Sequence, residues 1–263
     1  MISGRAAGLL ATAAIPLTIA CGGAAPLPVS EYEVITTFPH DAAAYTQGLL
    51  FHEGHLYEST GRYGESSLRK VHIESGRIVD SVAVDSALFA EGLARVGSEL
   101  YQLTWREGVA MVYDLATLER RREFTYEGEG WGLCYDGRSL WMSDGSATLT
   151  RRDPATFEVL GELKVMAGGR PLGALNELEC VDDAIWANVY QTDRIVRIDP
   201  ATGAVTTEID GRQLSVIGGR PPGVDAVLNG IAFIPETGVF LLTGKLWGRV
   251  LAVRVEGTSP AGG

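Results

Sequence analysis

The chain of 263 residues is poor in the residue types on which common catalytic sites depend. It has four histidines, and none of them follows His72, so a thiol nucleophile in the later part of the chain would have no histidine base near it in sequence. It has no Gly-x-Ser-x-Gly sequence and no phosphate-binding P-loop. His52 and His55 straddle a predicted hairpin turn and lack the helical spacing of a zincin, so we interpret them as exposed turn residues. The usual hydrolase, nucleotide-binding and zinc-protease sites are therefore not predicted.

Positive charge is also scarce. The chain has 22 Lys and Arg against 33 Asp and Glu, a formal net charge of -11. Nucleic-acid phosphates would be repelled by such a surface, so we predict no nucleic-acid partner. The hydrophobic share of 46% and the charged share of 21% are those of an ordinary globular protein with a sizeable core.

The sequence predicts short β-hairpins and no long helices. The apolar runs 133–135 and 140–142 flank Asp136-Gly137, a pair that accepts the positive φ angles of a tight turn. A similar pattern occurs at 175–188, around Asp182-Asp183. No amphipathic helix of normal length is evident, so we predict an all-β protein.

The hairpins belong to a repeat. We take five positions as equivalent, and they lie 44, 40, 45 and 53 residues apart: Gly48, Gly92, Gly132, Glu177 and Gly230. Four short strands in every 40 to 50 residues is the period of β-propeller blades, so we predict a five-bladed β-propeller. The long fourth interval contains 212–225, whose glycines and prolines predict a loop.

Ring closure is predicted from the two ends of the domain. The last repeat has room for three strands, at 231–234, 239–242 and 250–255. The strand predicted at 32–38 would supply the fourth and cover an exposed edge. We therefore predict one catalytic domain over 31–256, followed by a flexible tail at 257–263, and we expect removal of residues up to Ser30 to be harmless.

The first 25 residues have the form of a signal peptide. Arg5 is the only early charge, and the apolar run Ala6–Ala20 is too short to span a bilayer comfortably. Thr18-Ile-Ala-Cys21 resembles a bacterial lipoprotein cleavage box, with Thr where Leu is usual. Lipid attachment at Cys21 and secretion after an alanine both remain open. In either case we expect an extracytoplasmic protein: periplasmic, anchored to the envelope by lipid, or secreted.

Two further cysteines, Cys134 and Cys180, occupy matching places in consecutive repeats. An oxidising compartment permits a disulfide between them. We favour the interpretation that they are two small buried apolar residues, and their pairing stays open.

The repeat also predicts a site. In a propeller the first strands of all blades begin near the central channel at one face, so polar or large residues at the repeat starts should converge there. These residues are Gln47, Glu91, Trp131, Asn176, Glu177 and Asn229. Each alone has a structural explanation, but convergent polar groups in a cleft indicate ligand binding. Glu91 is the best candidate for acid–base chemistry.

Several motifs carry a resemblance to a known family. They are Tyr45-Thr-Gln-Gly-Leu49, Glu58-Ser-Thr-Gly61, Glu129-Gly-Trp-Gly-Leu133, Ser143-Asp-Gly-Ser146, Leu175-Asn-Glu-Leu-Glu179, Ile185-Trp-Ala-Asn-Val-Tyr-Gln-Thr-Asp193, Leu228-Asn-Gly-Ile-Ala232 and Thr243-Gly-Lys-Leu-Trp247. The chain from about Phe38 to Val255 resembles the plant and bacterial type of glutaminyl-peptide cyclotransferase. That family consists of five-bladed propellers, and the resemblance implies conversion of an N-terminal glutamine of peptides or proteins to pyroglutamate and ammonia. It implies no metal and no cofactor.

The resemblance also implies roles for individual residues. Glu91 matches the acid/base glutamate, and the substrate pocket would be formed by Tyr45, Gln47, Phe89, Trp105, Trp131, Asn176, Tyr190 and Lys245. The two tryptophans would offer indole N–H groups and aromatic walls, the two amides would bond the substrate amine and carboxamide, and the lysine would donate to a carbonyl. Tyr45 stands where Phe is common and Tyr190 where Trp is usual, so the role of the residue at 190 is open.

Two other interpretations are retained. Secreted propellers of the gluconolactonase and paraoxonase kind hold calcium at the channel and hydrolyse lactones, and Glu91, Asn176, Glu177 and Asn229 are possible oxygen ligands. A non-catalytic envelope scaffold is the third interpretation.

Overall fold

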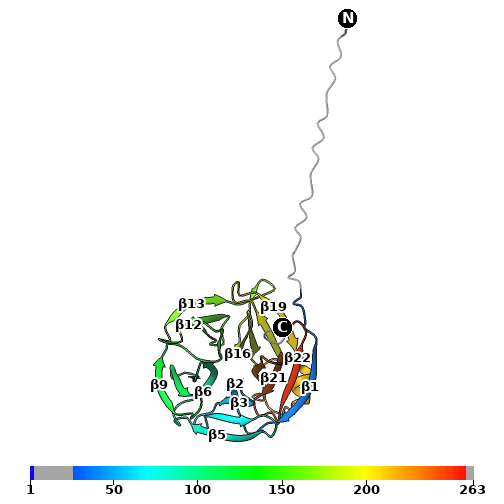
Figure 1. Cartoon of the computed structure of the whole chain (residues 1–263). Helices are drawn as coiled ribbons and strands as arrows, with labels where there is room; N and C mark the ends of the chain where they lie inside the picture. The colour runs from blue at the N-terminus through cyan, green and yellow to red at the C-terminus, as the bar shows by residue number, and fades with distance from the viewer. Residues whose placement is uncertain (3–25, 259–263) are drawn as a thin grey trace.

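The computed structural model describes residues 1–2 and 26–258. They form five four-stranded antiparallel sheets arranged around a central axis (Figure 1). The predicted five-bladed β-propeller is therefore confirmed. The expected signal peptide with Cys21, apart from its first two residues, and positions 259–263 of the expected tail lie outside the described residues.

Each blade is a meander of consecutive strands, except the last. Blade 1 consists of β2 (Thr46–His52), β3 (His55–Thr60), β4 (Ser67–His72) and β5 (Arg77–Ala83). Blade 2 consists of β6 (Ala90–Val96), β7 (Glu99–Thr104), β8 (Val109–Asp114) and β9 (Arg120–Thr125). Blade 3 consists of β10 (Leu133–Tyr135), β11 (Leu140–Met142), β12 (Thr148–Arg152) and β13 (Val159–Lys164). Blade 4 consists of β16 (Leu175–Val181), β17 (Ala184–Val189), β18 (Arg194–Ile198) and β19 (Val205–Asp210).

Blade 5 closes the ring as expected. Its three C-terminal strands are β20 (Leu228–Ile234), β21 (Val239–Gly244) and β22 (Arg249–Val255). The fourth is β1 (Tyr32–Pro39), which pairs antiparallel with β22 from Tyr32↔Val255 to Pro39↔Arg249. The N-terminal strand therefore occupies the outer edge that β22 would otherwise expose.

The chain just before β1 pairs with a different blade. Val29 forms a parallel bridge with Glu208 on β19 of blade 4. The Glu208 N–H donates to the Pro28 carbonyl at 2.9 Å, and the Ser30 N–H donates to the Glu208 carbonyl at 2.8 Å. Leu27 packs against the core between blades 3 and 4. These contacts correct the expectation that residues up to Ser30 contribute nothing.

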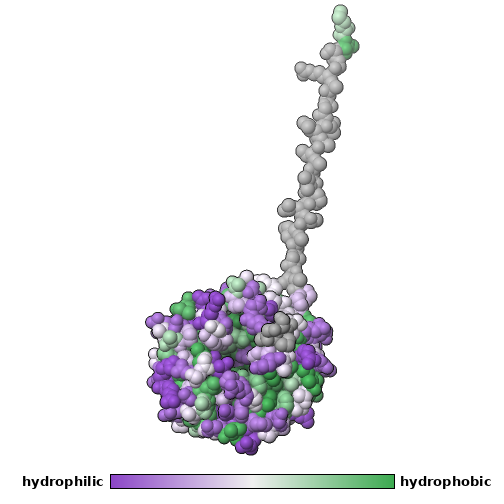
Figure 2. Space-filling model, viewed as in Figure 1, coloured by the Kyte–Doolittle hydropathy of each residue, from purple (hydrophilic) through white to green (hydrophobic). Residues whose placement is uncertain are grey.

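The apolar core is divided among the five junctions between blades. One cluster of buried residues lies at each junction, and each joins side chains of two neighbouring blades. The inner strands are almost wholly buried, whereas the outermost strands β5 and β9 are almost wholly exposed. Figure 2 shows hydrophilic residues spread over the viewed face, with hydrophobic patches between them.

Glycine at the repeat starts allows the blades to approach closely. A Cβ atom added to Gly132 would lie 2.0 Å from the Asn176 carbonyl oxygen of blade 4. One added to Gly48 would lie 2.5 Å from the Leu93 nitrogen of blade 2. The repeated glycine is thus a packing requirement of the channel wall, where neighbouring backbones come into contact.

Two local elements were not predicted. The segment 212–225, which we expected to be a loop throughout, contains the six-residue helix α1 (Arg212–Ile217). Its Leu214 is buried in the core between blades 4 and 5, and this burial explains the helical turn. Strands β14 (Met166–Ala167) and β15 (Arg170–Pro171) form a small additional hairpin. No helix in the described part of the chain is long and apolar enough to cross a membrane.

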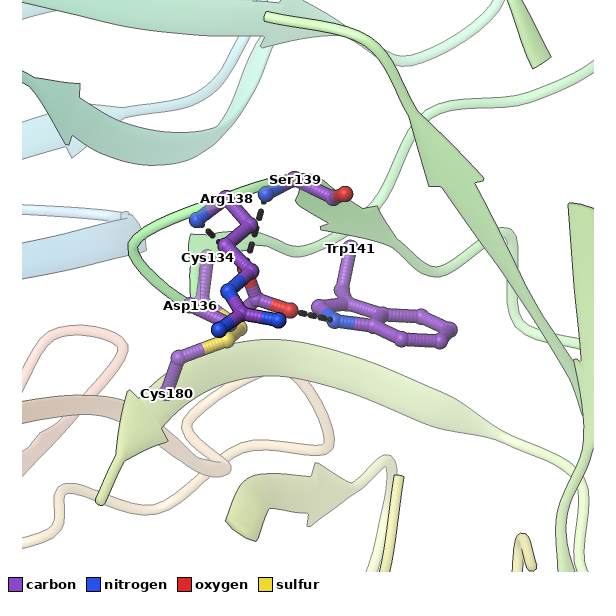
Figure 3. The surroundings of a disulfide bond; sticks show 6 residues. All are labelled: Cys134, Asp136, Arg138, Ser139, Trp141 and Cys180. Carbon is purple, nitrogen blue, oxygen red and sulfur yellow. Dashed lines mark hydrogen bonds between the residues drawn. A yellow bond between two sulfur atoms is a disulfide. The ribbon is translucent and has the colours of Figure 1, made fainter. Parts of the chain in front are cut away.

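Cys134 and Cys180 form a disulfide that joins β10 of blade 3 to β16 of blade 4. Our favoured interpretation, two separate buried thiols, was therefore wrong. Figure 3 shows Asp136 beside this bond, where its Oδ2 accepts the Trp141 indole N–H at 2.8 Å. Its Oδ1 accepts the backbone N–H groups of Arg138 and Ser139, which fixes the predicted hairpin turn.

Candidate active site

The structure brings all nine expected site residues together. They line one cavity of about 200 Å³: Tyr45, Gln47, Phe89, Glu91, Trp105, Trp131, Asn176, Tyr190 and Lys245. Each lies on or beside the start of an innermost strand or just after the end of the second strand of a blade. All five blades therefore contribute to this cavity, and its lining includes four of the six residues that the repeat placed at the channel.

Glu91 lies at the start of β6 and is 5% exposed. Its Oε1 accepts the Gln47 side-chain amide N–H at 2.9 Å, from the inner strand of blade 1. Burial raises the pKa of this carboxyl well above its usual value; the positive charge of Lys245 opposes the rise, and the charges of Glu129 and Glu107 add to it. A carboxyl group with a raised pKa is suited to exchanging a proton with an amine near neutral pH.

Lys245 follows β21 and is 3% exposed. Its ammonium lies 4.6 Å from the centre of the Tyr45 ring and 5.3 Å from that of Tyr190. Burial lowers the pKa of Lys245 to about 8, while the negative charges of Glu91 and Asp225 act in the opposite direction. The two aromatic faces provide part of the stabilisation that water would give a cation.

Two buried amide oxygens in the cavity have no hydrogen-bond donor among the described residues. They are Gln47 Oε1 and Asn176 Oδ1, on side chains that are each 2% exposed. A buried polar atom without a partner costs free energy, so such atoms at a cavity wall indicate groups that a ligand satisfies. Here they call for a ligand with N–H donors.

Aromatic rings form the remaining walls. Phe89 lies edge-on to Tyr45, at 6.3 Å between ring centres, and to Trp105, at 5.6 Å. On the other side, Trp131 lies edge-on to Tyr190, at 5.5 Å. Tyr190, whose role the sequence left open, thus supports one aromatic wall and provides a face for the ammonium of Lys245.

The indole N–H groups are not directed as the sequence predicted. We expected both to be offered to a ligand, but Trp105 Nε1 donates to Glu129 Oε2 at 2.8 Å and Trp131 Nε1 donates to the same oxygen at 3.0 Å. The tryptophans therefore contribute walls, and their polar atoms are already satisfied. Sequence reasoning missed Glu129, although it belongs to the quoted motif and precedes Trp131 by two residues.

Two of the residues expected at the channel do not line the cavity. Glu177 is fully buried, and its carboxylate accepts the backbone N–H groups of Ile231 at 2.8 Å and Leu49 at 3.3 Å. Asn229 donates from Nδ2 to the Thr46 carbonyl at 3.0 Å. These side chains connect the innermost strands of different blades, so the calcium-ligand set that we considered does not converge with Glu91.

A buried pair of titratable side chains, His40 and Glu58, contacts segments next to cavity residues in sequence. His40 Nε2 is 3.0 Å from Glu58 Oε1, and His40 Nδ1 is 2.8 Å from the Trp247 carbonyl. Burial alone would lower the pKa of His40, but the charge and hydrogen bond of Glu58 outweigh it and raise that pKa; Asp41 acts in the same direction. Burial would raise the pKa of Glu58, yet His40, Arg69 and the Thr46 hydroxyl lower it. The pair connects the chain before Tyr45 to the loop that follows Lys245.

The fold and the cavity together define a five-bladed propeller with an enzyme-like pocket. In this pocket a buried carboxyl, a buried ammonium and unsatisfied amide oxygens meet between aromatic walls. A family profile described as glutamine cyclotransferase matches residues 7–255. The chain belongs to the glutamine cyclotransferase family, and it is an enzyme of the glutaminyl-peptide cyclotransferase type.

Individual relatives agree with this assignment. The chain is 39% identical over 239 residues to the glutaminyl-peptide cyclotransferase of Arabidopsis thaliana, covering 89% of this chain and 74% of that protein. It is similar to the crystal structure of Myxococcus xanthus glutaminyl cyclase, with a TM-score of 0.82 and 41% identity, covering 88% of this chain and 98% of that one. The WD40 repeats of RRP9 match at 11% identity with a TM-score of 0.50, covering 82% of this chain and 77% of that one, which shows a shared propeller architecture alone.

Proposed function

We propose that this protein converts the N-terminal glutamine of peptides and proteins to pyroglutamate with release of ammonia, and that Glu91 acts first as general base and then as general acid without a metal ion. The observation that carries the proposal is the placement of the buried Glu91 carboxyl beside two amide oxygens that lack donors. The names of the Arabidopsis and Myxococcus relatives support the substrate class.

The cavity complements an N-terminal glutamine. The α-amine and the carboxamide nitrogen of the substrate both carry N–H donors, which Gln47 Oε1 and Asn176 Oδ1 are placed to accept. The carbonyl oxygen of the carboxamide requires a donor, and the ammonium of Lys245 is a buried cationic donor in the same cavity. The aromatic walls enclose the methylene groups of the glutamine side chain and exclude water.

Proton transfer then follows from the raised pKa of Glu91. A peptide α-amine has a pKa of about 7.7–8.0, so a large fraction of it is already neutral near that pH. The neutral amine nitrogen forms a bond to the side-chain carbonyl carbon, and the Glu91 carboxylate takes the proton that this nitrogen then carries in excess. The same proton, delivered to the carboxamide nitrogen, allows the C–N bond to break and ammonia to leave. Atoms and charge balance with no further reactant.

The negative charge on the carbonyl oxygen in the tetrahedral intermediate needs a fixed donor. Both indole N–H groups are bound to Glu129, so we assign this role to Lys245. Removing one such donor typically costs ~3–4 kcal/mol of transition-state stabilisation. Because the pKa of Lys245 is lowered to about 8, kcat/KM should fall as the pH rises above that value. On the acid side it should fall as Glu91 and the substrate α-amine become protonated.

We also propose that the mature protein lies outside the cytoplasm and carries a lipid on Cys21. The disulfide between Cys134 and Cys180 supports an oxidising compartment. Labelling of cells with a radioactive fatty acid tests the lipid directly. The wild-type protein should take up the label, and Cys21→Ala should not. A secreted wild-type protein without label would refute lipid attachment.

The proposal is tested by measuring ammonia release from a glutamine-initiated dipeptide. Glu91→Gln keeps the size of the side chain but removes its basic site, so kcat should fall by ~10²–10⁴-fold with little change in KM. The matched control is Glu127→Gln on an exposed carboxylate, which should leave kcat unchanged. Melting temperatures must accompany both measurements, since a merely structural Glu91 would lower stability and spare kcat in the folded fraction.

Metal dependence is tested in the same assay. Turnover should be unchanged after incubation with EDTA. Loss of activity that calcium restores would contradict the metal-independent mechanism and favour the lactonase-like interpretation. A lack of turnover by the folded wild-type protein would refute the proposed function itself.

A further inference from the structure

One carboxylate oxygen connects the two tryptophan walls of the cavity. Glu129 Oε2 accepts the indole N–H of Trp105 at 2.8 Å and that of Trp131 at 3.0 Å. Trp105 follows β7 of blade 2, whereas Trp131 precedes β10 of blade 3. The two walls therefore belong to different sheets, and Glu129 links them directly at the mouth of the channel.

Arg106 completes the arrangement on the solvent side. Its Nε donates to the other oxygen, Glu129 Oε1, at 3.1 Å, and its guanidinium carbon lies 3.6 Å from the centre of the Trp105 ring. The edge of Phe89 meets Trp105 at 5.6 Å between ring centres. Trp105 is thus held through its N–H by Glu129, over its face by Arg106 and beside Phe89.

Glu129 keeps its negative charge at neutral pH. Burial alone would raise its pKa, but hydrogen bonds from the Trp131 and Trp105 indoles and from Arg106 outweigh burial and lower it. Its ion pair with Arg106 is largely exposed, with side chains 37% and 59% accessible, so that pair contributes little to stability. Hydrogen bonds to an ionised acceptor are roughly twice as strong as neutral ones, so the two indole bonds are the interactions that matter here.

We propose that Glu129 is a positioning residue for the reaction: its carboxylate fixes the Trp105 and Trp131 walls relative to each other, so that the glutaminyl side chain is held against Glu91. This inference rests on the proposed function. Without Glu129 both indoles lose their only described hydrogen-bond acceptor, and each ring gains freedom to rotate about its side-chain torsions. A misplacement of about 1 Å at reacting atoms can cost about 10²-fold in rate.

The charge of Glu129 has a second consequence. It lies near enough to Glu91 to raise the pKa of that carboxyl. The groups that act on Glu91 are Lys245, which lowers its pKa, and Glu129 and Glu107, which raise it. Removal of the charge at 129 should therefore shift the acid limb of the kcat/KM profile toward lower pH, an effect that loss of fold stability does not produce.

Two substitutions separate positioning from charge. Glu129→Ala removes both the acceptor and the charge, and kcat on a glutamine-initiated dipeptide should fall by about 10- to 100-fold. Glu129→Gln keeps an acceptor oxygen for the indoles and removes only the charge. It should keep kcat within about threefold of wild type and shift the acid limb downward. Glu127→Ala, two residues earlier on the same exposed segment, is the matched control and should change neither kcat nor the pH profile.

Acrylamide quenching of tryptophan fluorescence reports on the walls without turnover. Trp141, Trp186 and Trp247 are buried, so the accessible fraction comes from Trp105 and Trp131. Quenching should increase in Glu129→Ala and remain close to wild type in Glu129→Gln. If Glu129→Ala fails to fold, Glu129→Gln decides the inference. This variant must show wild-type quenching together with an acid limb of the kcat/KM profile that is shifted to lower pH, and any other result contradicts the inference.

A folded Glu129→Ala protein with wild-type kcat and wild-type quenching would overturn the inference. Equal loss of kcat in the Ala and Gln variants would also overturn it, because the amide retains the acceptor. These failures differ from failure of the proposed function, which appears as a wild-type protein that releases no ammonia. In that case the quenching comparison still decides whether Glu129 holds the two walls.

Discussion

The disulfide between blades 3 and 4 gives a stability prediction whose magnitude follows from the length of the loop that it closes. Cys134 and Cys180 are 46 residues apart in sequence. A cross-link of this span removes about 13 cal/mol/K of entropy from the unfolded chain, which corresponds to about 4 kcal/mol at 25 °C. For a domain of this size, that change lowers the melting temperature by roughly 8–16 °C.

The assay is thermal unfolding of four proteins, all carrying Cys21→Ala so that no third thiol interferes. Cys134→Ala, Cys180→Ala and the double variant should melt within a few degrees of each other, since each removes the same cross-link. The protein that keeps both cysteines should melt highest, and reductant should lower its melting temperature without affecting the double variant. At 25 °C the variants should remain active, because the cavity residues themselves are unchanged.

The prediction has a clear refutation. If thiol titration shows complete reduction and the melting temperature of the two-cysteine protein moves by less than about 2 °C, the cross-link does not stabilise the fold. Unequal single variants would show instead that packing of one sulfur atom, rather than the covalent bond, determines the loss.

Three further perturbations have defined outcomes. The pair formed by His40 and Glu58 stabilises the fold most between pH 4.5 and 6.5, the ordinary pKa values of the two groups. Its contribution is lost as the pH rises through the raised pKa of His40. His40→Gln should therefore lower the melting temperature more at pH 6 than at pH 9. Deletion through Ser30 removes two backbone hydrogen bonds to blade 4 and should lower the melting temperature by roughly 4–8 °C, whereas deletion through Phe38 removes nearly all of β1 and should cost far more; equal values would contradict the closure scheme. Gly132→Ala places a Cβ 2.0 Å from a carbonyl oxygen of the next blade and should cost about 1–3 kcal/mol or more in chemical denaturation, so an unchanged midpoint would show that the blades can separate slightly.

The fold was predictable because a repeated local pattern defines it. Asp-Gly turns, strand lengths and the glycine at each repeat start are properties of neighbouring residues, and they recur with a period that few architectures share. The closing strand was predictable because the last repeat has room for only three strands and the strand at 32–38 belonged to no other repeat. The bridge of Val29 to blade 4 was not predictable, because its pairing through backbone groups leaves no pattern in the side chains.

The site was predictable in its membership and less so in its hydrogen bonds. Positions in the repeat place Gln47, Glu91, Trp131 and Asn176 at one mouth, and the resemblance supplied the lysine and the other aromatic residues. Which atom bonds which depends on side-chain directions that sequence spacing does not determine. For this reason the indole N–H groups were expected to face a ligand, whereas they meet Glu129. Likewise, the repeat alone did not show that Glu177 links strands instead of lining the cavity as Glu91 does.

The pairing of β1 with β22 has a consequence for how the protein is made. Glu33 on the first strand contacts Arg254 on the last one, 221 residues later, so these two strands can pair only after β22 has been synthesised. During elongation four blades can form in order, while the first strand waits without its partner and exposes unpaired backbone groups. Blade 5 is then the last unit to assemble, and the cavity, which needs Lys245 from that blade, is completed in the same event. A chain truncated near its C-terminus would therefore lose the enzyme site together with the ring, rather than retain a partly active fragment.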